Sequence, residues 1–81
     1  MIGNEIARYS HENGINEFFI EIEESYSEKI KGDLVSFLKN IDALDKEIYI
    51  NYVTGIEGYR IEPLIFQNQK KNIEKYLINL D

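Results

Sequence analysis

The sequence predicts an α+β fold in which an N-terminal helix and a central amphipathic helix pack on a small antiparallel sheet built around a β-hairpin. Three observations predict this fold. An apolar stripe with helical spacing follows Ser27, apolar and acidic residues alternate over residues 18–23, and two strand-like stretches flank the glycine-containing residues 55–58. Because 81 residues leave room for one core, we expect a single small globular domain over residues 1–81.

The first expected element is a short helix over residues 4–11. Asn4 can cap its N-terminus, and Ile6 and Tyr9 fall on one apolar stripe. Gly14 can adopt the left-handed conformation that ends many helices. We therefore expect the chain to turn at this glycine and to begin a second element after it.

The second element, over residues 15–26, fits two periodicities. Helical spacing connects the apolar residues Ile15, Phe18, Phe19, Ile22 and Tyr26. The alternation of a strand instead places Phe18, Ile20 and Ile22 on one face and Glu21 and Glu23 on the other. Ile20 favours the strand, because a helix would place it off the apolar stripe. We expect a strand, with a helix as the alternative.

The clearest helical pattern covers residues 27–42. Ser27 can cap this helix, and Glu28 lies in the first turn, where a carboxylate interacts favourably with the helix dipole. One apolar stripe then runs along the segment through Ile30, Leu34, Phe37, Leu38 and Ile41. The pattern predicts an amphipathic helix that packs its stripe on the sheet.

Residues 47–66 have the pattern of a hairpin. Strand-like stretches at 48–53 and 59–62 flank a loop at 55–58 that begins and ends with glycine. Alternation should place Ile48, Ile50 and Tyr52 on one face of the first strand and Tyr49, Asn51 and Val53 on the other. Pro63 cannot donate a ladder hydrogen bond, so we expect its strand to lie at an edge of the sheet or to bend there.

The last segment, residues 72–80, has two interpretations. Ile73, Tyr76, Leu77 and Leu80 have the spacing of an amphipathic helix. Residues 76–80 would also serve as a strand that closes the sheet. Both interpretations remain open from the sequence.

From about Leu34 onward, the order of features resembles a WYL domain, a small β-rich module of bacterial regulators. The corresponding stretches are residues 48–52, the turn at 55–58, Arg60-Ile61-Glu62-Pro63-Leu64, and Lys75-Tyr76-Leu77, in which Lys75 replaces the signature tryptophan of the family. The resemblance implies a strand at the C-terminus. It also implies a regulatory module that senses a small ligand or nucleic acid, with a concave site near Tyr52, Arg60 and Tyr76.

The charge of the chain is unevenly distributed. Its net charge is −6, and residues 1–45 carry ten acidic and four basic side chains. Residues 46–81 carry five of each, and the basic side chains cluster only at Lys70, Lys71 and Lys75. Such a charge distribution repels nucleic acid, so we expect no direct nucleic-acid binding and instead a protein partner with a basic surface.

The sequence contains no recognisable catalytic set. His11 is its single histidine and there is no cysteine, so a Cys–His pair is excluded. Glu21 and Glu23 would share one face of a strand, but a solvated outer face explains them better than a two-carboxylate cleft. No EF-hand or phosphate-loop spacing occurs. We therefore expect neither an enzyme nor a cofactor nor a metal site.

The composition also bears on where the protein acts. The absence of cysteine and of a basic, apolar N-terminal leader indicates a cytoplasmic protein. Uninterrupted apolar runs of at most three residues predict no membrane span. The abundance of Ile, Asn, Lys and Tyr is typical of AT-rich genomes, as in low-GC bacteria and their phages.

The functional hypothesis that follows is a small, acidic, non-catalytic binding protein: an inhibitor, an immunity-type protein or an accessory regulator. Aromatic residues supply much of the binding energy at protein interfaces. The residues predicted to bind the partner are Glu17, Glu21, Glu23, Glu24 and Glu28 as an acidic face, with Tyr49 and Tyr52 as aromatic anchors. A core of this size gains stability when more apolar surface is buried. A homodimer is therefore a second expected partner arrangement.

Overall fold

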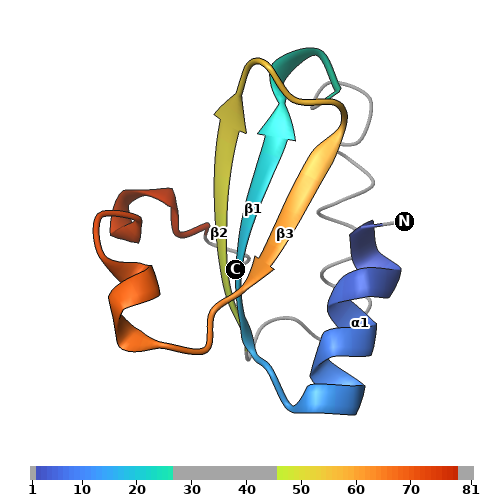
Figure 1. Cartoon of the computed structure of the whole chain (residues 1–81), viewed down its shortest axis with the longest axis vertical. Helices are drawn as coiled ribbons and strands as arrows, with labels where there is room; N and C mark the ends of the chain where they lie inside the picture. The colour runs from blue at the N-terminus through green and yellow to red at the C-terminus, as the bar shows by residue number, and fades with distance from the viewer. Residues whose placement is uncertain (1, 27–45, 79–81) are drawn as a thin grey trace.

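The computed structural model describes residues 2–26 and 46–78, in which one helix and a three-stranded mixed sheet confirm the α+β fold class (Figure 1). The elements are helix α1 (Ile2–Asn13), strands β1 (Glu17–Glu23), β2 (Glu47–Val53) and β3 (Tyr59–Pro63), and the short 3₁₀ helices η2 (Gln67–Lys70) and η3 (Glu74–Tyr76). The strand expected within residues 15–26 is confirmed. The amphipathic helix expected over residues 27–42 lies outside the described residues.

Helix α1 is longer than predicted at both ends, and the chain turns after it at Gly14, as the sequence indicates. Gly14 follows it with a φ of +67°, and its amide N–H donates to the carbonyl of Ser10 at 3.0 Å. The Ser10 hydroxyl donates to the carbonyl of Ile15 at 2.9 Å. The first bond satisfies a carbonyl that the helix end leaves open, and the second ties the chain beyond Gly14 back to the helix just before β1.

The predicted hairpin is wrong, because β1 lies between the two strands that were expected to pair. The strand order is β2-β1-β3, with β1 parallel to β2 and antiparallel to β3. Strands β2 and β3 therefore run in opposite directions without sharing a ladder (Figure 1). The sheet is mixed and not purely antiparallel.

The loop over residues 54–58 explains why the hairpin pattern misleads. To reach β3 from β2, the chain crosses two strand spacings, about 10 Å in all. Five residues span that distance easily. Gly55 and Gly58 have φ angles of +86° and +68°, which bend the loop without the strain that a side chain would add. The same two glycines serve a tight hairpin or a wider crossing, so their spacing does not distinguish the two.

The core lies between α1 and one face of β1. Ile6 from the helix and Phe18, Ile20 and Ile22 from β1 are at most 1% exposed, and Ile48 of β2 joins them. The aromatic rings of Tyr9, Tyr26 and Tyr59 lie at its border. A further link between the layers is the Tyr59 hydroxyl, which donates to Glu5 of α1 at 3.3 Å. Burial and this contact raise the pKa of Tyr59.

Within the described residues, the C-terminal segment contains a single 3₁₀ turn followed by a strand-like contact. After the single turn of η3, Leu77 forms an isolated antiparallel bridge with Tyr49. The Ile78 amide N–H donates to the carbonyl of Ile48 at 2.9 Å. This segment therefore extends the sheet beside β2. At the opposite end of the strand order, β3 carries Pro63, which confirms the expected edge position.

Truncation of the core should measure how much the domain depends on β1. Shortening Ile20 to valine should cost about 0.5–1.5 kcal/mol of unfolding free energy, and Ile20→Ala about 2–5 kcal/mol, because the side chain is fully buried. Chemical denaturation measures both values. Leu77→Ala is the matched control, since its side chain is 52% exposed and should change stability by less than about 0.5 kcal/mol. Equal losses at the two positions would contradict the assignment of the core.

Candidate functional site

The candidate site is the sheet face opposite the core, which is acidic along β1. Because side chains alternate along a strand, Glu17, Glu21 and Glu23 point away from the side that buries Ile20 and Ile22. The sequence predicted this arrangement, and the burial pattern of β1 agrees with it at every position.

The neighbouring strands add charge to the same face. Register pairs Glu17 with Glu47 of β2, and Glu21 with Arg60 of β3. Glu62 lies beside Phe19. Among the described residues, this face therefore joins five carboxylates with Arg60, and Lys70 reaches it from η2.

Lys70 offsets the negative charge at the Glu17 end of this face and holds the C-terminal segment against it. Its ammonium group forms an ion pair with Glu17, and it lies 3.7 Å from a carboxylate oxygen of Glu47. Two glutamates in register at this position would repel each other without a cation between them. Nearby, the ring of Tyr76 stacks on Phe19 with 5.9 Å between centroids. The C-terminal segment therefore covers the part of the face around Glu17 and does not contact Glu21 or Glu23 through these interactions.

The pKa shifts at this cluster follow its hydrogen bonds. A side-chain hydrogen bond with Glu17 and one donated by the Tyr49 hydroxyl at 2.9 Å lower the pKa of Glu47, and Lys70 lowers it further. Hydrogen bonding to Glu17 raises the pKa of Lys70. Burial and the bond to Glu47 raise the pKa of Tyr49. Each shift favours the charged carboxylate, the ammonium and the neutral phenol at neutral pH, so the cluster is a structural contact.

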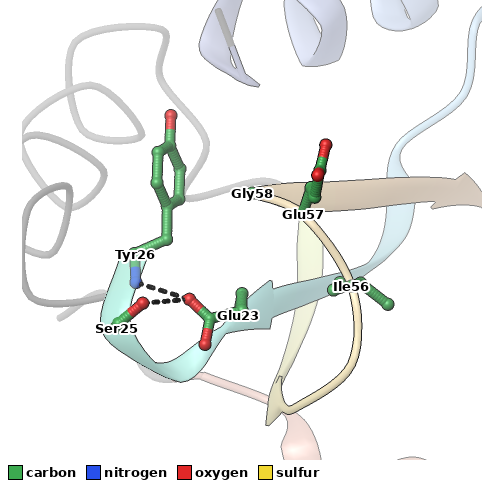
Figure 2. A pocket seen from close by; sticks show the side chains of 6 residues that line it. All are labelled: Glu23, Ser25, Tyr26, Ile56, Glu57 and Gly58. Atoms are coloured by element: carbon green, nitrogen blue, oxygen red, sulfur yellow. Dashed lines mark hydrogen bonds between the residues drawn. The ribbon is translucent and has the colours of Figure 1, made fainter.

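At the other end of β1, the acidic residues border an open pocket of about 530 Å³ (Figure 2). The Glu23 carboxylate accepts hydrogen bonds from the Ser25 hydroxyl and, at 3.1 Å, from the Tyr26 amide N–H. These bonds, the Ser25 hydroxyl first, lower the pKa of Glu23. Glu57 from the loop between β2 and β3 also lines the pocket, but its carboxylate points away from that of Glu23 (Figure 2). The two carboxylates therefore do not converge on one point.

A second hollow, of about 370 Å³, lies along β1 and β3. Its lining residues are Phe19, Glu21, Arg60, Ile61, Glu62 and Pro63. On this face of the sheet, the guanidinium of Arg60 and the carboxylates of Glu21 and Glu62 lie around the ring of Phe19. This composition suits a side chain with an apolar body and a polar or positive end, such as those found on protein surfaces.

The structure brings together only part of the predicted partner-binding set. Glu17, Glu21 and Glu23 share the acidic face, Glu24 is exposed just after β1, and Glu28 lies outside the described residues. Tyr49 is 5% exposed, so little of its side chain is available to contact a partner. Tyr52 is 47% exposed but lies on the opposite face, where register pairs it with Ile22.

The alternative ligand site near Tyr52, Arg60 and Tyr76 is not formed. Arg60 shares the acidic face with Glu21, and Tyr76 stacks on Phe19 of that face. Tyr52 points to the other side of the sheet. Three side chains divided between two faces cannot enclose one ligand.

Sequence reasoning missed the contacts made by the C-terminal segment and its exposed apolar residues. Ile65 and Phe66 are 65% and 66% exposed, whereas Leu64 before them is buried. The available signal was the apolar run that these three residues form directly after Pro63, a residue that ends a strand. The ion pair of Lys70 with Glu17 spans 53 positions and has no local signature.

Comparison with known proteins adds no relative. No protein-family model, no curated protein and no solved structure matches this chain significantly. Within residues 2–26 and 46–78, no helix is long and apolar enough to cross a membrane. In the same part of the chain, no group of three or more acidic, histidine or cysteine side chains is placed to hold a metal ion.

The Lys70 cluster should make stability depend on pH in the acid range. Because the pKa of Glu47 is lowered on folding, its contribution is complete above its ordinary value of 4.5 and is lost as pH falls through the lower folded value. The wild type should lose unfolding free energy as pH falls from 6 to 3. The Glu47→Gln variant should lose less of it over the same range. Urea denaturation across this range measures it. Glu62→Gln, an exposed change on the same face, is the control. Parallel stability profiles of Glu47→Gln and the wild type would contradict this role of Glu47.

Proposed function

We propose that this protein is a small, non-catalytic binding protein whose acidic sheet face docks on a basic protein surface. The observation that supports it best is the arrangement along β1, where Glu21 and Glu23 share a face that Lys70 does not reach. Glu24 extends the acidic surface beyond the strand. Proteins of this class act as inhibitors, immunity-type proteins or accessory regulators of the partner that they cover.

Electrostatics supports a basic partner. The net charge of −6 attracts a positive surface over a distance of about one Debye length and raises the association rate. Among the described residues of the open face, Arg60 is the single cation opposite these glutamates. A carboxylate-rich face of this kind repels the phosphates of nucleic acid. A protein partner fits this surface better than DNA or RNA does.

The state of the carboxylates supports binding over catalysis. A general acid or base is most effective when its pKa lies near the working pH, which for glutamate requires a raised value. The pKa of Glu23 is instead lowered by the Ser25 hydroxyl. Its hydrogen bonds orient a carboxylate that is charged at neutral pH and can attract a lysine or arginine of the partner.

Charge reversal on this face should weaken partner binding at low salt. The variant is Glu21→Lys with Glu24→Lys, which leaves the hydrogen bonds of Glu23 in place. The control is Glu12→Lys with Glu74→Lys, which makes the same change in net charge at exposed positions on α1 and η3. We expect the face variant to lose roughly tenfold or more in affinity, because like charges then meet at the interface.

The measurement is capture from a lysate of the source organism at about 50 mM and about 300 mM salt, with the bound protein identified by mass spectrometry. The purified partner is then titrated with both variants. A basic protein that binds at low salt, weakens at high salt and discriminates the face variant from the control supports the proposal. Equal binding by the two variants would rule out the acidic face as the docking surface.

A further inference from the structure

A strap of chain, residues 65–77, crosses the Glu17 end of the acidic face. Leu64 directly before the strap is buried, and its amide N–H donates to the carbonyl of Glu17 on β1. At the other end of the strap, Leu77 forms its bridge with Tyr49 of β2. The strap therefore leaves the sheet from β3 and returns beside β2, on the other side of β1 (Figure 1).

The strap is anchored at its two ends and is only lightly packed between them. None of residues 65–77 is buried, and its two helices are 3₁₀ helices of four and three residues. Directly after it, Ile78 packs against the core. Segments with few buried apolar contacts open at a lower free energy than the core does. This packing allows the strap to detach from the face while Leu64 and Ile78 stay in place.

Two side chains hold the strap against the face. Lys70 forms its ion pair with Glu17, and the two side chains of this pair are 27% and 31% exposed. Tyr76 stacks on Phe19 with 5.9 Å between the ring centroids. An ion pair between solvent-accessible side chains adds little net stability. A cation from another molecule can therefore replace Lys70, because Glu17 keeps an ionic partner in the exchange.

The residues under the strap continue the row of side chains that the proposed function uses. Alternate residues of β1 form this row, in the order Glu17, Phe19, Glu21 and Glu23. Neighbours in the row stand about 7 Å apart. With the strap closed, only the Glu21 end is open, although each side of a specific interface contributes about 20–30 residues. A partner that docks on Glu21 and Glu23 therefore needs adjoining surface, and the Glu17 end is continuous with theirs along β1.

We propose that the strap is an autoinhibitory contact, in which Lys70 and Tyr76 occupy the part of the acidic face that a lysine- or arginine-bearing segment of the partner takes when it binds. This inference rests on the proposed function and adds its regulation. Lys70 makes with Glu17 the same ammonium–carboxylate contact that a lysine of the partner would make. Once Tyr76 leaves, the ring of Phe19 accepts a cationic side chain over its face. The apparent affinity for a basic segment is then set by the fraction of molecules in which the strap is open.

A charge-neutral change separates release of the strap from a general change in electrostatics. Tyr76→Ser removes the stack on Phe19 and leaves the net charge as it is. We expect it to tighten the binding of a fluorescein-labelled hexalysine peptide at least about threefold, because more of the molecules then have an open strap. Leu77→Ser is the matched control, since it alters an exposed side chain of the strap that makes neither holding contact.

Fluorescence anisotropy at about 50 mM salt measures these affinities. Hexalysine suits the test because an extended chain of six residues has about the length of the row from Glu17 to Glu23. Equal affinities of Tyr76→Ser, Leu77→Ser and the wild type would overturn the proposal.

Removal of the cation tests Lys70 directly. Lys70→Gln should tighten hexalysine binding at least about threefold more than Lys71→Gln, which makes the same change in net charge at an exposed neighbouring position. Adding Glu17→Gln to Lys70→Gln should abolish this gain, because the vacated carboxylate is then missing. Equal gains from the two single lysine variants would exclude Lys70 as the occupant of the face.

The failure of this inference differs from the failure of the proposed function. The variant Glu21→Lys with Glu24→Lys changes the open end of the face. If it binds hexalysine more weakly than the wild type while Tyr76→Ser and Lys70→Gln change nothing, only the autoinhibitory contact is refuted. If it binds hexalysine as tightly as the wild type, the acidic face does not dock cations, and the proposed function fails together with its regulation.

Discussion

The structure depends on the two-residue alternation of β1, because this strand is hydrogen-bonded on both sides and defines both faces of the sheet. One set of alternate residues fills the core at 0–1% exposure, and the other set makes the acidic face. A shift of one residue in its register would bury Glu21 and expose Ile20, which is costly for both side chains. Burial on one face therefore fixes the register, and the register aligns the glutamates on the other.

The acidic face is shaped by a second contact, the return of the C-terminal segment. Stacking of Tyr76 on Phe19 and the ion pair of Lys70 with Glu17 cover one end of the face, while Leu77 bridges to β2. Lys70 removes the repulsion between Glu17 and Glu47 that their register creates. The segment thus divides one line of carboxylates into a structural part and an open part. Only the open part, around Glu21 and Glu23, remains suited to attract a partner.

The sequence pattern predicted the features that depend on residues close together in the chain. It did not predict the strand order, which depends on contacts between distant segments. The helix end at Gly14, the strand through Ile20 and the edge position of Pro63 each follow from properties of one short segment. The insertion of β1 between β2 and β3 does not, because the loop glycines allow a tight hairpin and a wider crossing alike. The burial of Tyr49 follows from that topology and from the returning segment. Sequence spacing alone therefore identified the acidic face, but it did not show that Tyr49 is buried on that face or that the exposed Tyr52 lies on the opposite one.

The position of β3 connects the fold to the exposed apolar residues Ile65 and Phe66. An exposed sheet edge invites pairing with other chains, and a proline on it removes one donor from the ladder. Pro63 is the last residue of the ladder with β1, the Leu64 amide N–H still donates to the carbonyl of Glu17, and Gln69 then holds the backbone of Ile65 and Phe66. Gln69 thus orders the backbone of Ile65 and Phe66, two exposed apolar residues, directly after the end of β3. A domain of this size has a core too small to enclose every large apolar side chain.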